Sequence, residues 1–161
     1  MVKELIINSN PNGVTIALLQ DKQLVELNKE QVNNNYAVGD IYLGKIKKIM
    51  PGLNAAFVDV GYEKDAFLHY TDLSPYARSL LKFTQHPIND NSSQGFNFAS
   101  FQVEPEIIKT GKINEVLSGK PNILVQILKE PIAAKGPRLS CEISLPGRFV
   151  VITPFNDIVA V

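Results

Sequence analysis

The stretch GLNAAFVDVGYEKDAFLHYTDL, residues 52–73, decides the fold class because it has the pattern of two strands around a short turn. Successive side chains of a strand point to opposite faces, so every second residue shares one environment. The apolar faces of the two predicted strands consist of Ala56, Val58 and Val60, and of Ala66, Leu68 and Tyr70. We expect these two faces to lie in a core.

The opposite faces carry Phe57 and Phe67 together with groups that favour water, among them Asp59, Asp65 and His69. If the strands pair around the turn from Val60 to Lys64, Phe57 lies directly across from Phe67. An exposed aromatic pair on adjacent strands is a platform for nucleic-acid bases, which contribute about 1–3 kcal/mol each by stacking. In the alternative interpretation a second layer of protein covers the two rings. This pattern alone leaves both interpretations open.

Strand-like runs recur along the chain, separated by turn signals such as Asn10-Pro11-Asn12-Gly13, and helical periodicity is scarce. The pattern predicts a mostly β protein, a barrel or a sandwich. The runs are KELIIN, VTIALLQ, QLVELN, DIYLGKIKKI, NAAFVDV, DAFLHY, NILVQILK, RLSCEISL and RFVVITP. Five of them, between Asp40 and Ile143, are enough for a small closed barrel of the OB-fold plan, with Gly44 expected to permit a bend or bulge. Phe57 and Phe67 fall on strands 2 and 3 of that plan, whose outer face binds oligonucleotides. The barrel therefore favours the stacking interpretation.

Three other segments complete the predicted organisation. The opening runs form a meander, followed by a polar linker at residues 31–40. Residues 84–105 are rich in Asn, Ser and Gln and are predicted to be a long irregular insert. Its Phe96, Phe98 and Phe101 are expected to pack onto the barrel, with contact to RNA as the alternative. Thr110–Leu117 is predicted to be a short strand or turn. The last apolar runs have no polar tail, so we expect partners for them beyond residue 161.

Charge gives a local signal only, because 16 basic and 16 acidic residues cancel. Lys45, Lys47 and Lys48 lie together, and residues 107–139 hold five Lys and one Arg against two Glu. Such clusters provide the positive potential that phosphates require, although lysines are also common on solvated strands.

Several classes of protein and site are not indicated. One cysteine excludes an internal disulfide and a multi-cysteine metal site, and Cys141 is predicted to be a small buried residue. Neither a signal peptide nor an apolar run of about 20 residues is present, so a cytoplasmic protein without a membrane segment is expected. Phosphate-loop, nucleophile-elbow and zinc-protease motifs are absent. Asp59 and Asp65 flank one hairpin, which is weak support for a metal site.

The segment GDIYLGKIKKIMPGLNAAFVDVGYEKDAFLHYTDL resembles the opening of an S-one domain, an RNA-binding OB-fold. The order of VQILKE (125–130), KGPRLS (135–140) and SLPGRF (144–149) after it resembles the N-terminal region of the ribonuclease E/G family of bacterial endoribonucleases. The resemblance covers nearly the whole chain apart from residues 84–105. Residues 1–38 would then be part of a ribonuclease-H-like subdomain, residues 39–143 the S-one domain, and residues 144–161 the start of a sensor of RNA 5′-monophosphate.

The resemblance implies a function in the cleavage of single-stranded RNA, in ribosomal RNA processing and messenger RNA decay. Phe57 and Phe67 match family positions that stack bases, and Lys135 matches one that pairs with phosphate. We add Lys45, Lys47 and Lys129 as supporting cations and His69 as a surface residue of the site. Pro137 departs from the family pattern, which more often has a small residue there. The Mg²⁺-binding catalytic carboxylates and the zinc-binding cysteines of the family are expected only in a full-length enzyme, as is a homo-oligomer. This chain should therefore bind RNA without cofactors and without cutting it.

Two alternatives belong to other functional classes. One is a free-standing S-one module that acts in translation without a nuclease. The other is a structural interaction domain whose Phe face is buried against a partner chain.

Overall fold

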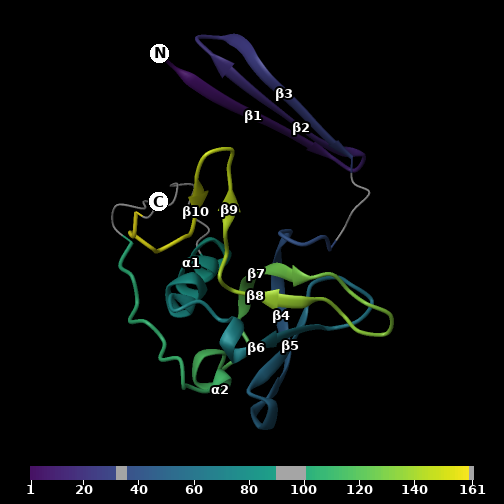
Figure 1. The fold of residues 1–161 in the computed structure, drawn as a ribbon, viewed down its shortest axis with the longest axis vertical. Helices are drawn as coiled ribbons and strands as arrows, with labels where there is room; N and C mark the ends of the chain where they lie inside the picture. Colours follow the sequence, from purple (N-terminus) through teal and green to yellow (C-terminus); the bar gives the residue numbers. More distant parts are fainter. Residues whose placement is uncertain (32–35, 90–100, 160–161) are drawn as a thin grey trace. The chain divides into compact units, whose positions relative to one another are not determined.

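A computed structural model describes residues 1–31, 36–89 and 101–159 of the chain. It divides into two units, Met1–Asn35 and Tyr36–Val161. Most of the regular structure is strand, as predicted, and Figure 1 labels the elements.

The first unit is a three-stranded antiparallel sheet of β1 (Lys3–Asn10), β2 (Gly13–Gln20) and β3 (Gln23–Gln31). Asp21 and Lys22 connect β2 to β3 with φ values of 48° and 66°. Two successive positive φ values match the twist of tight hairpin turns. The predicted meander is confirmed. Leu5 and Ile7 on β1 are 63% and 60% exposed. The sheet therefore has apolar surface that no residue in the described part of the chain covers.

The second unit contains a closed five-stranded barrel, which confirms the predicted architecture. Its strands are β4 (Ile41–Met50), β5 (Ala55–Asp59), β6 (Ala66–His69), β7 (Asn122–Lys129) and β8 (Arg138–Ser140). The order around the barrel is β4-β5-β6-β8-β7, and only the β6–β8 pair is parallel. The parallel pair therefore closes the barrel and brings β8 beside β6.

The barrel interior contains the residues of the predicted hairpin that alternation assigned to a core. All six residues of the two apolar faces are buried, and Ile123, Val125, Ile127 and Leu139 join them from β7 and β8. Ala55 lies on the same side of β5 as Phe57 by alternation, yet it is fully buried. Cys141 is buried as predicted, at 1% exposure.

Gly44 has a different role from the predicted bulge. The β4 bulge lies between Ile46 and Lys48, where the register with β5 shifts. A Cβ atom on Gly44 would lie 2.5 Å from Val58 Cγ1 and 3.3 Å from Val125 Cγ2. Gly44 is therefore required because side chains of the barrel interior fill the space next to its backbone.

The region predicted as an irregular insert begins with a helix. Helix α1 (Ala77–Asn89) includes residues 84–89, and a short helix α2 (Ile113–Val116) occupies the segment expected to be a strand or turn. The buried residues Ala77, Leu80 and Thr84 have helical spacing, and α1 lies beside β7, with Gln85 Nε2 donating to Asn122 O (2.9 Å). Phe96 and Phe98 lie outside the described residues. Phe101 packs against Phe83 and Phe155, with ring centroids 6.3 and 5.4 Å away.

The short elements complete the unit. They are the 3-10 helices η1 (Pro51–Leu53) and η2 (Tyr70–Asp72) and the strands β9 (Leu145–Pro146) and β10 (Val151–Ile152). The predicted strand 138–145 is thus divided into β8 and β9, and β9 pairs with β10 in a separate two-stranded sheet.

Candidate nucleic-acid interface

One row of side chains crosses all five strands on the outside of the barrel. Directly paired residues lie on the same face of a sheet. Lys48 on β4 pairs with Phe57 on β5, which pairs with Phe67 on β6. Phe67 pairs with Arg138 on β8, and Arg138 pairs with Lys129 on β7. Two aromatic rings therefore lie between cations on both sides.

The aromatic pair has the predicted register, since Phe57 lies across from Phe67. Their ring centroids are 5.9 Å apart and the ring planes meet at 66°, an edge-to-face arrangement. Both rings are partly exposed. His69 follows on the same strand, 6.4 Å from Phe67 and inclined to it by 27°. The three rings form a surface that has one side open to solvent.

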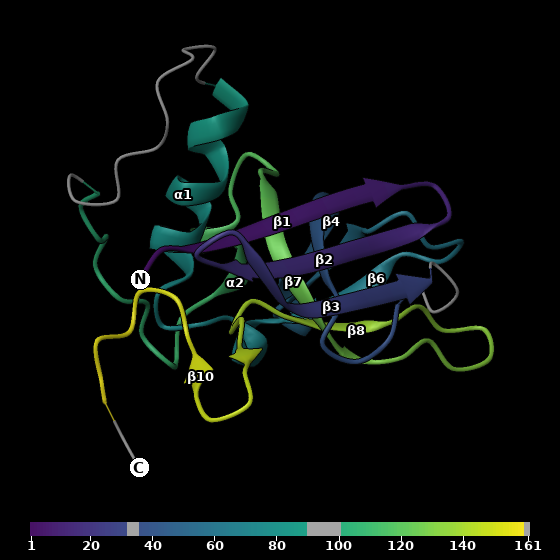
Figure 2. The same ribbon diagram turned by 90° about the horizontal axis from the view of Figure 1, so that it is seen from above.

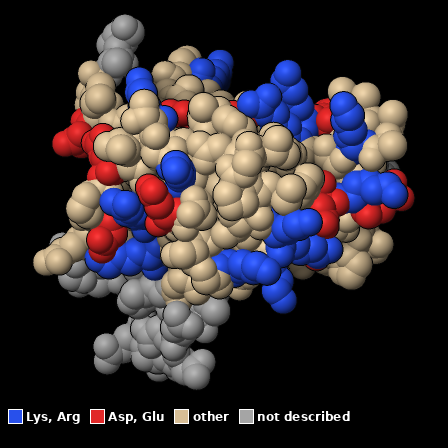
Figure 3. Space-filling model, turned by 90° about the horizontal axis from the view of Figure 1, so that it is seen from below, with Lys and Arg blue, Asp and Glu red and all other residues tan. Residues whose placement is uncertain are grey.

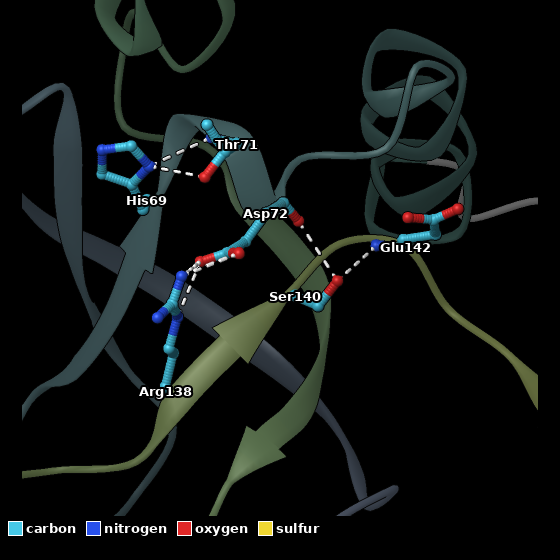
Figure 4. Close-up of polar contacts among 6 residues, drawn as sticks. All are labelled: His69, Thr71, Asp72, Arg138, Ser140 and Glu142. Atoms are coloured by element: carbon cyan, nitrogen blue, oxygen red, sulfur yellow. Dashed lines mark hydrogen bonds and ion pairs between the residues drawn. The ribbon is translucent and has the colours of Figure 1, made fainter.

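The orientation of His69 is set by the residue two positions later. The backbone N–H of Thr71 donates to His69 Nδ1 (3.2 Å), and Thr71 Oγ1 lies 2.8 Å from the same nitrogen (Figure 4). Because Nδ1 accepts a hydrogen bond, the neutral ring carries its proton on Nε2. His69 can therefore donate a hydrogen bond from Nε2.

A hollow of about 620 Å³ adjoins the rings. It is lined by Phe57, Lys64, Asp65, Phe67, Ala134, Lys135, Gly136 and Arg138. The hollow thus combines the two rings with three cations and one carboxylate. Lys64 and Lys135 are exposed and form no ion pair with a described residue.

The loop between β7 and β8 carries Lys135 and projects from the barrel in both ribbon views (Figures 1 and 2). The backbones of Ile132 and Lys135 hydrogen-bond to each other in both directions, at 3.3 and 3.0 Å. A Cβ atom on Gly136 would lie 2.3 Å from Asp65 O, so the loop passes very close to the β5–β6 turn. Pro137 O then accepts a hydrogen bond from Phe67 N–H (2.9 Å). The KGP sequence therefore fixes Lys135 close to the rings.

Arg138 is held by a two-point ion pair. Its Nε and Nη2 donate to Asp72 Oδ2 (2.9 Å) and Oδ1 (3.0 Å), as Figure 4 shows. The Asp72 side chain is 11% exposed and that of Arg138 is 40% exposed. The Asp72 carbonyl also accepts from Ser140 Oγ (3.2 Å) and from Cys141 N–H (2.9 Å). The guanidinium therefore has a fixed plane beside Phe67, and no residue in the described part of the chain accepts a hydrogen bond from its Nη1.

The three predicted supporting lysines have different surroundings. Lys45 pairs with Asp59 in the β4–β5 register, and Lys129 is at the end of the row. Lys47 Nζ lies 2.9 Å from Asp65 Oδ1 and 3.3 Å from Asp59 Oδ2. Hydrogen bonds to these two carboxylates, first to Asp65, raise the pKa of Lys47. Its charge is thus already balanced by the two acids.

Asp59 has two partners, the backbone N–H of Gly61 and the ammonium of Lys47. Its pKa is lowered first by the Gly61 N–H, which donates to Oδ1 (2.9 Å), and then by Lys47. Asp59 and Asp65 are the two acids considered for a metal site, and the Lys47 ammonium lies between them, where a metal ion would have to bind. In residues 1–31, 36–89 and 101–159, no group of three or more His, Cys, Asp or Glu side chains could hold a metal ion.

Sequence reasoning did not assign Lys48, Lys64 or Arg138 to the site, although Lys48 and Arg138 belong to the cation clusters that it noted. The β4 bulge places Lys48, and not Lys47, opposite Phe57, and a bulge could not be located from alternation. Arg138 reaches Phe67 only through the parallel β6–β8 pair, which the sequence does not indicate. Lys64 could have been found from its position in the hairpin turn next to Phe67.

The charge on one face of the molecule is mixed. Figure 3 shows Lys and Arg side chains around an area of uncharged residues, with Asp and Glu side chains among them. This pattern agrees with a net charge of zero and a local group of cations. Within the described part of the chain, no helix combines the length and apolar character needed to cross a membrane.

Comparison with known proteins gives a consistent set of relatives, although no family model matches. The chain is 34% identical to ribonuclease G of Haemophilus influenzae over 158 residues. The aligned residues make up 98% of this chain and 28% of that protein. Ribonuclease G of Escherichia coli K12 is 31% identical over 156 residues, 96% of this chain and 27% of that protein. Ribonuclease E of a Nostoc species is 35% identical over 141 residues, 87% of this chain and 16% of that protein. The chain thus spans little more than a quarter of the ribonuclease G relatives.

Proposed function

This chain is homologous to the ribonuclease E/G family over nearly its whole length, and from that premise we propose that its barrel binds single-stranded RNA for a longer endoribonuclease. The observation that supports this function is the row in which Phe57 and Phe67 lie between Lys48 on one side and Arg138 on the other. Aromatic surfaces with cations beside them bind single strands with little sequence preference.

Each residue of the interface has a chemical task in this proposal. Phe57 and Phe67 stack bases, and His69 donates a hydrogen bond from Nε2. Phosphates are bound by Lys135 and, at the edges, by the further cations Lys45, Lys48, Lys64 and Lys129. Lys47 contributes less, because Asp59 and Asp65 already balance its charge.

Catalysis is assigned to other parts of such an enzyme. Cleavage of RNA, Mg²⁺ and Zn²⁺ sites, and homo-oligomers would belong to a full-length protein in the cytoplasm, where it would act in ribosomal RNA processing and messenger RNA decay. Unit 1 would be part of a ribonuclease-H-like subdomain, and its exposed apolar residues would pack there. The chain as given should not cleave RNA in the presence of Mg²⁺. A free-standing module acting in translation is less well supported, because the ribonuclease relatives match 96–98% of the chain.

Fluorescence anisotropy with a labelled eight-nucleotide single-stranded RNA tests the proposal. Loss of one stacked base, worth about 1–3 kcal/mol, lowers the affinity of Phe57→Ala or Phe67→Ala about 5- to 150-fold. Three phosphate contacts would weaken wild-type binding roughly 20-fold between 50 and 200 mM salt. Phe149→Ala is the matched control, since Phe149 is 85% exposed and lies outside the hollow. Equal binding by wild type, Phe57→Ala and Phe67→Ala would refute the stacking function and favour a structural interaction domain.

A further inference from the structure

A second cavity lies next to the proposed RNA surface, and the function inferred for it depends on that proposal. The cavity has a volume of about 330 Å³ and is lined by residues of η2 and of the segment that follows the insert. Thr71 is part of its lining and is also the residue that binds His69 Nδ1. The cavity therefore begins where the series Phe57, Phe67 and His69 ends.

The wall of the cavity is fixed to the barrel before any ligand binds. The Tyr70 hydroxyl donates to Ile108 O, and Ile107 N–H donates to Pro75 O (2.9 Å). Asn54 donates from Nδ2 to Gly111 O (3.1 Å) and accepts from Ile113 N–H (2.8 Å). These hydrogen bonds hold residues 107–113 in place, so that a ligand would bind without paying the cost of ordering this segment.

The lining combines one cation, one carboxylate and an apolar surface. Lys109 and Glu142 both line the cavity, both are exposed, and they form no ion pair with each other or with another described residue. Leu73, Pro75 and Ile107 provide an apolar surface. A lysine binds a phosphate, and a carboxylate only accepts hydrogen bonds, as from a ribose 2′-hydroxyl. The volume is near the lower end of the range of about 300–1,000 Å³ that is typical of small-ligand sites.

We propose that this cavity binds one further nucleotide of the RNA strand, with its phosphate on Lys109 and its 2′-hydroxyl on Glu142. The network in Figure 4 connects the two sites, because Glu142 N–H donates to Ser140 Oγ and Ser140 Oγ donates to Asp72 O. Asp72 in turn binds Arg138 in the hollow. A strand stacked on the two rings would therefore continue past His69 into a site that distinguishes RNA from DNA.

The test uses the whole chain and labelled RNAs of four and eight nucleotides. Lys109→Ala should weaken binding of the eight-nucleotide RNA about 3- to 10-fold and lower its salt slope by about 0.7, the value for one phosphate contact with a single strand. The four-nucleotide RNA, which the rings and His69 can hold, should bind unchanged. Lys112→Ala is the matched control, because Lys112 is exposed three residues away and does not line the cavity.

Glu142→Gln should reduce the preference for the eight-nucleotide RNA over the DNA of the same sequence. Equal losses in Lys109→Ala and Lys112→Ala would overturn the proposal, since they would indicate only a general effect of charge. Unchanged binding of both RNA lengths by Lys109→Ala would overturn it too. Failure of the proposed function would give a different result. Phe57→Ala and Phe67→Ala would then bind both RNA lengths as tightly as the wild type.

Discussion

Substitution of Gly136 by alanine tests whether close backbone packing places Lys135 beside the rings. The new Cβ would lie 2.3 Å from Asp65 O, 2.8 Å from Asp65 C and 2.9 Å from Lys64 O. All three are backbone atoms, so no side-chain rotation relieves the overlap. Ordinary van der Waals contacts of a Cβ atom are 3.4–4 Å long, so the loop would have to move by roughly 1 Å.

The movement has a cost that can be estimated from the structure. It disturbs the hydrogen bond from Phe67 N–H to Pro137 O (2.9 Å), whose net contribution to stability is about 0.5–1.5 kcal/mol. Overpacking of this kind typically costs about 1–3 kcal/mol. Gly136→Ala should therefore lower the free energy of unfolding of the second unit by about 1–3 kcal/mol. It should also weaken RNA binding, because Lys135 moves away from Phe67.

Thermal unfolding followed by near-ultraviolet circular dichroism of the tyrosines measures the first effect. A loss of 1 kcal/mol corresponds to roughly 4 °C in Tm for a unit of this size. Gly52→Ala is the matched control, because nothing lies within 4 Å of a Cβ at that position. The control should change stability by less than about 1 kcal/mol, since alanine mainly restricts the unfolded chain. If Gly136→Ala and Gly52→Ala unfold at the same temperature and bind RNA equally, the packing argument is wrong.

The remaining predictions concern three polar groups of the second unit. Asp72→Asn removes the carboxylate that fixes Arg138 and should lower the free energy of unfolding by about 1–2 kcal/mol, a value reduced because Arg138 is partly exposed. Urea denaturation measures this change, and an unchanged midpoint would contradict a stabilising ion pair. Burial raises the pKa of the Cys141 thiol, so a thiol reagent at pH 8 should react only after denaturant unfolds the chain. Rapid labelling of the native chain would contradict this prediction, because it would show that the thiol is accessible. The pKa of Asp59 is depressed by Gly61 N–H and then by Lys47, so its contribution to stability is present above the pKa of the unfolded state and is lost as the pH falls through the lower, folded-state pKa. A carbon-13 NMR titration should find that Lys47→Ala raises this pKa only in part, because the Gly61 N–H remains; an unaltered titration would rule out a contribution from Lys47.

The sequence by itself determined the features that depend on local pattern. Alternation identified the buried faces of β5 and β6, and the short turn between them set the pairing of Phe57 with Phe67. A hairpin is predictable because its two strands are adjacent in the chain and a short turn leaves few registers. The five barrel strands were found for the same reason, since each has its own run of strand-forming residues.

Tertiary structure alone decided how distant segments complete the interface. Arg138 lies beside Phe67 because β6 and β8 pair in parallel, and such pairing depends on closure of the whole barrel. The bulge in β4 gives Lys48 the place opposite Phe57, and Lys47 bonds to two carboxylates instead. The parallel pair brings together residues far apart in the chain, and local sequence pattern locates neither that pair nor the bulge. The sequence thus specifies which strands form, and packing of those strands around one core specifies which side chains meet on the outer surface.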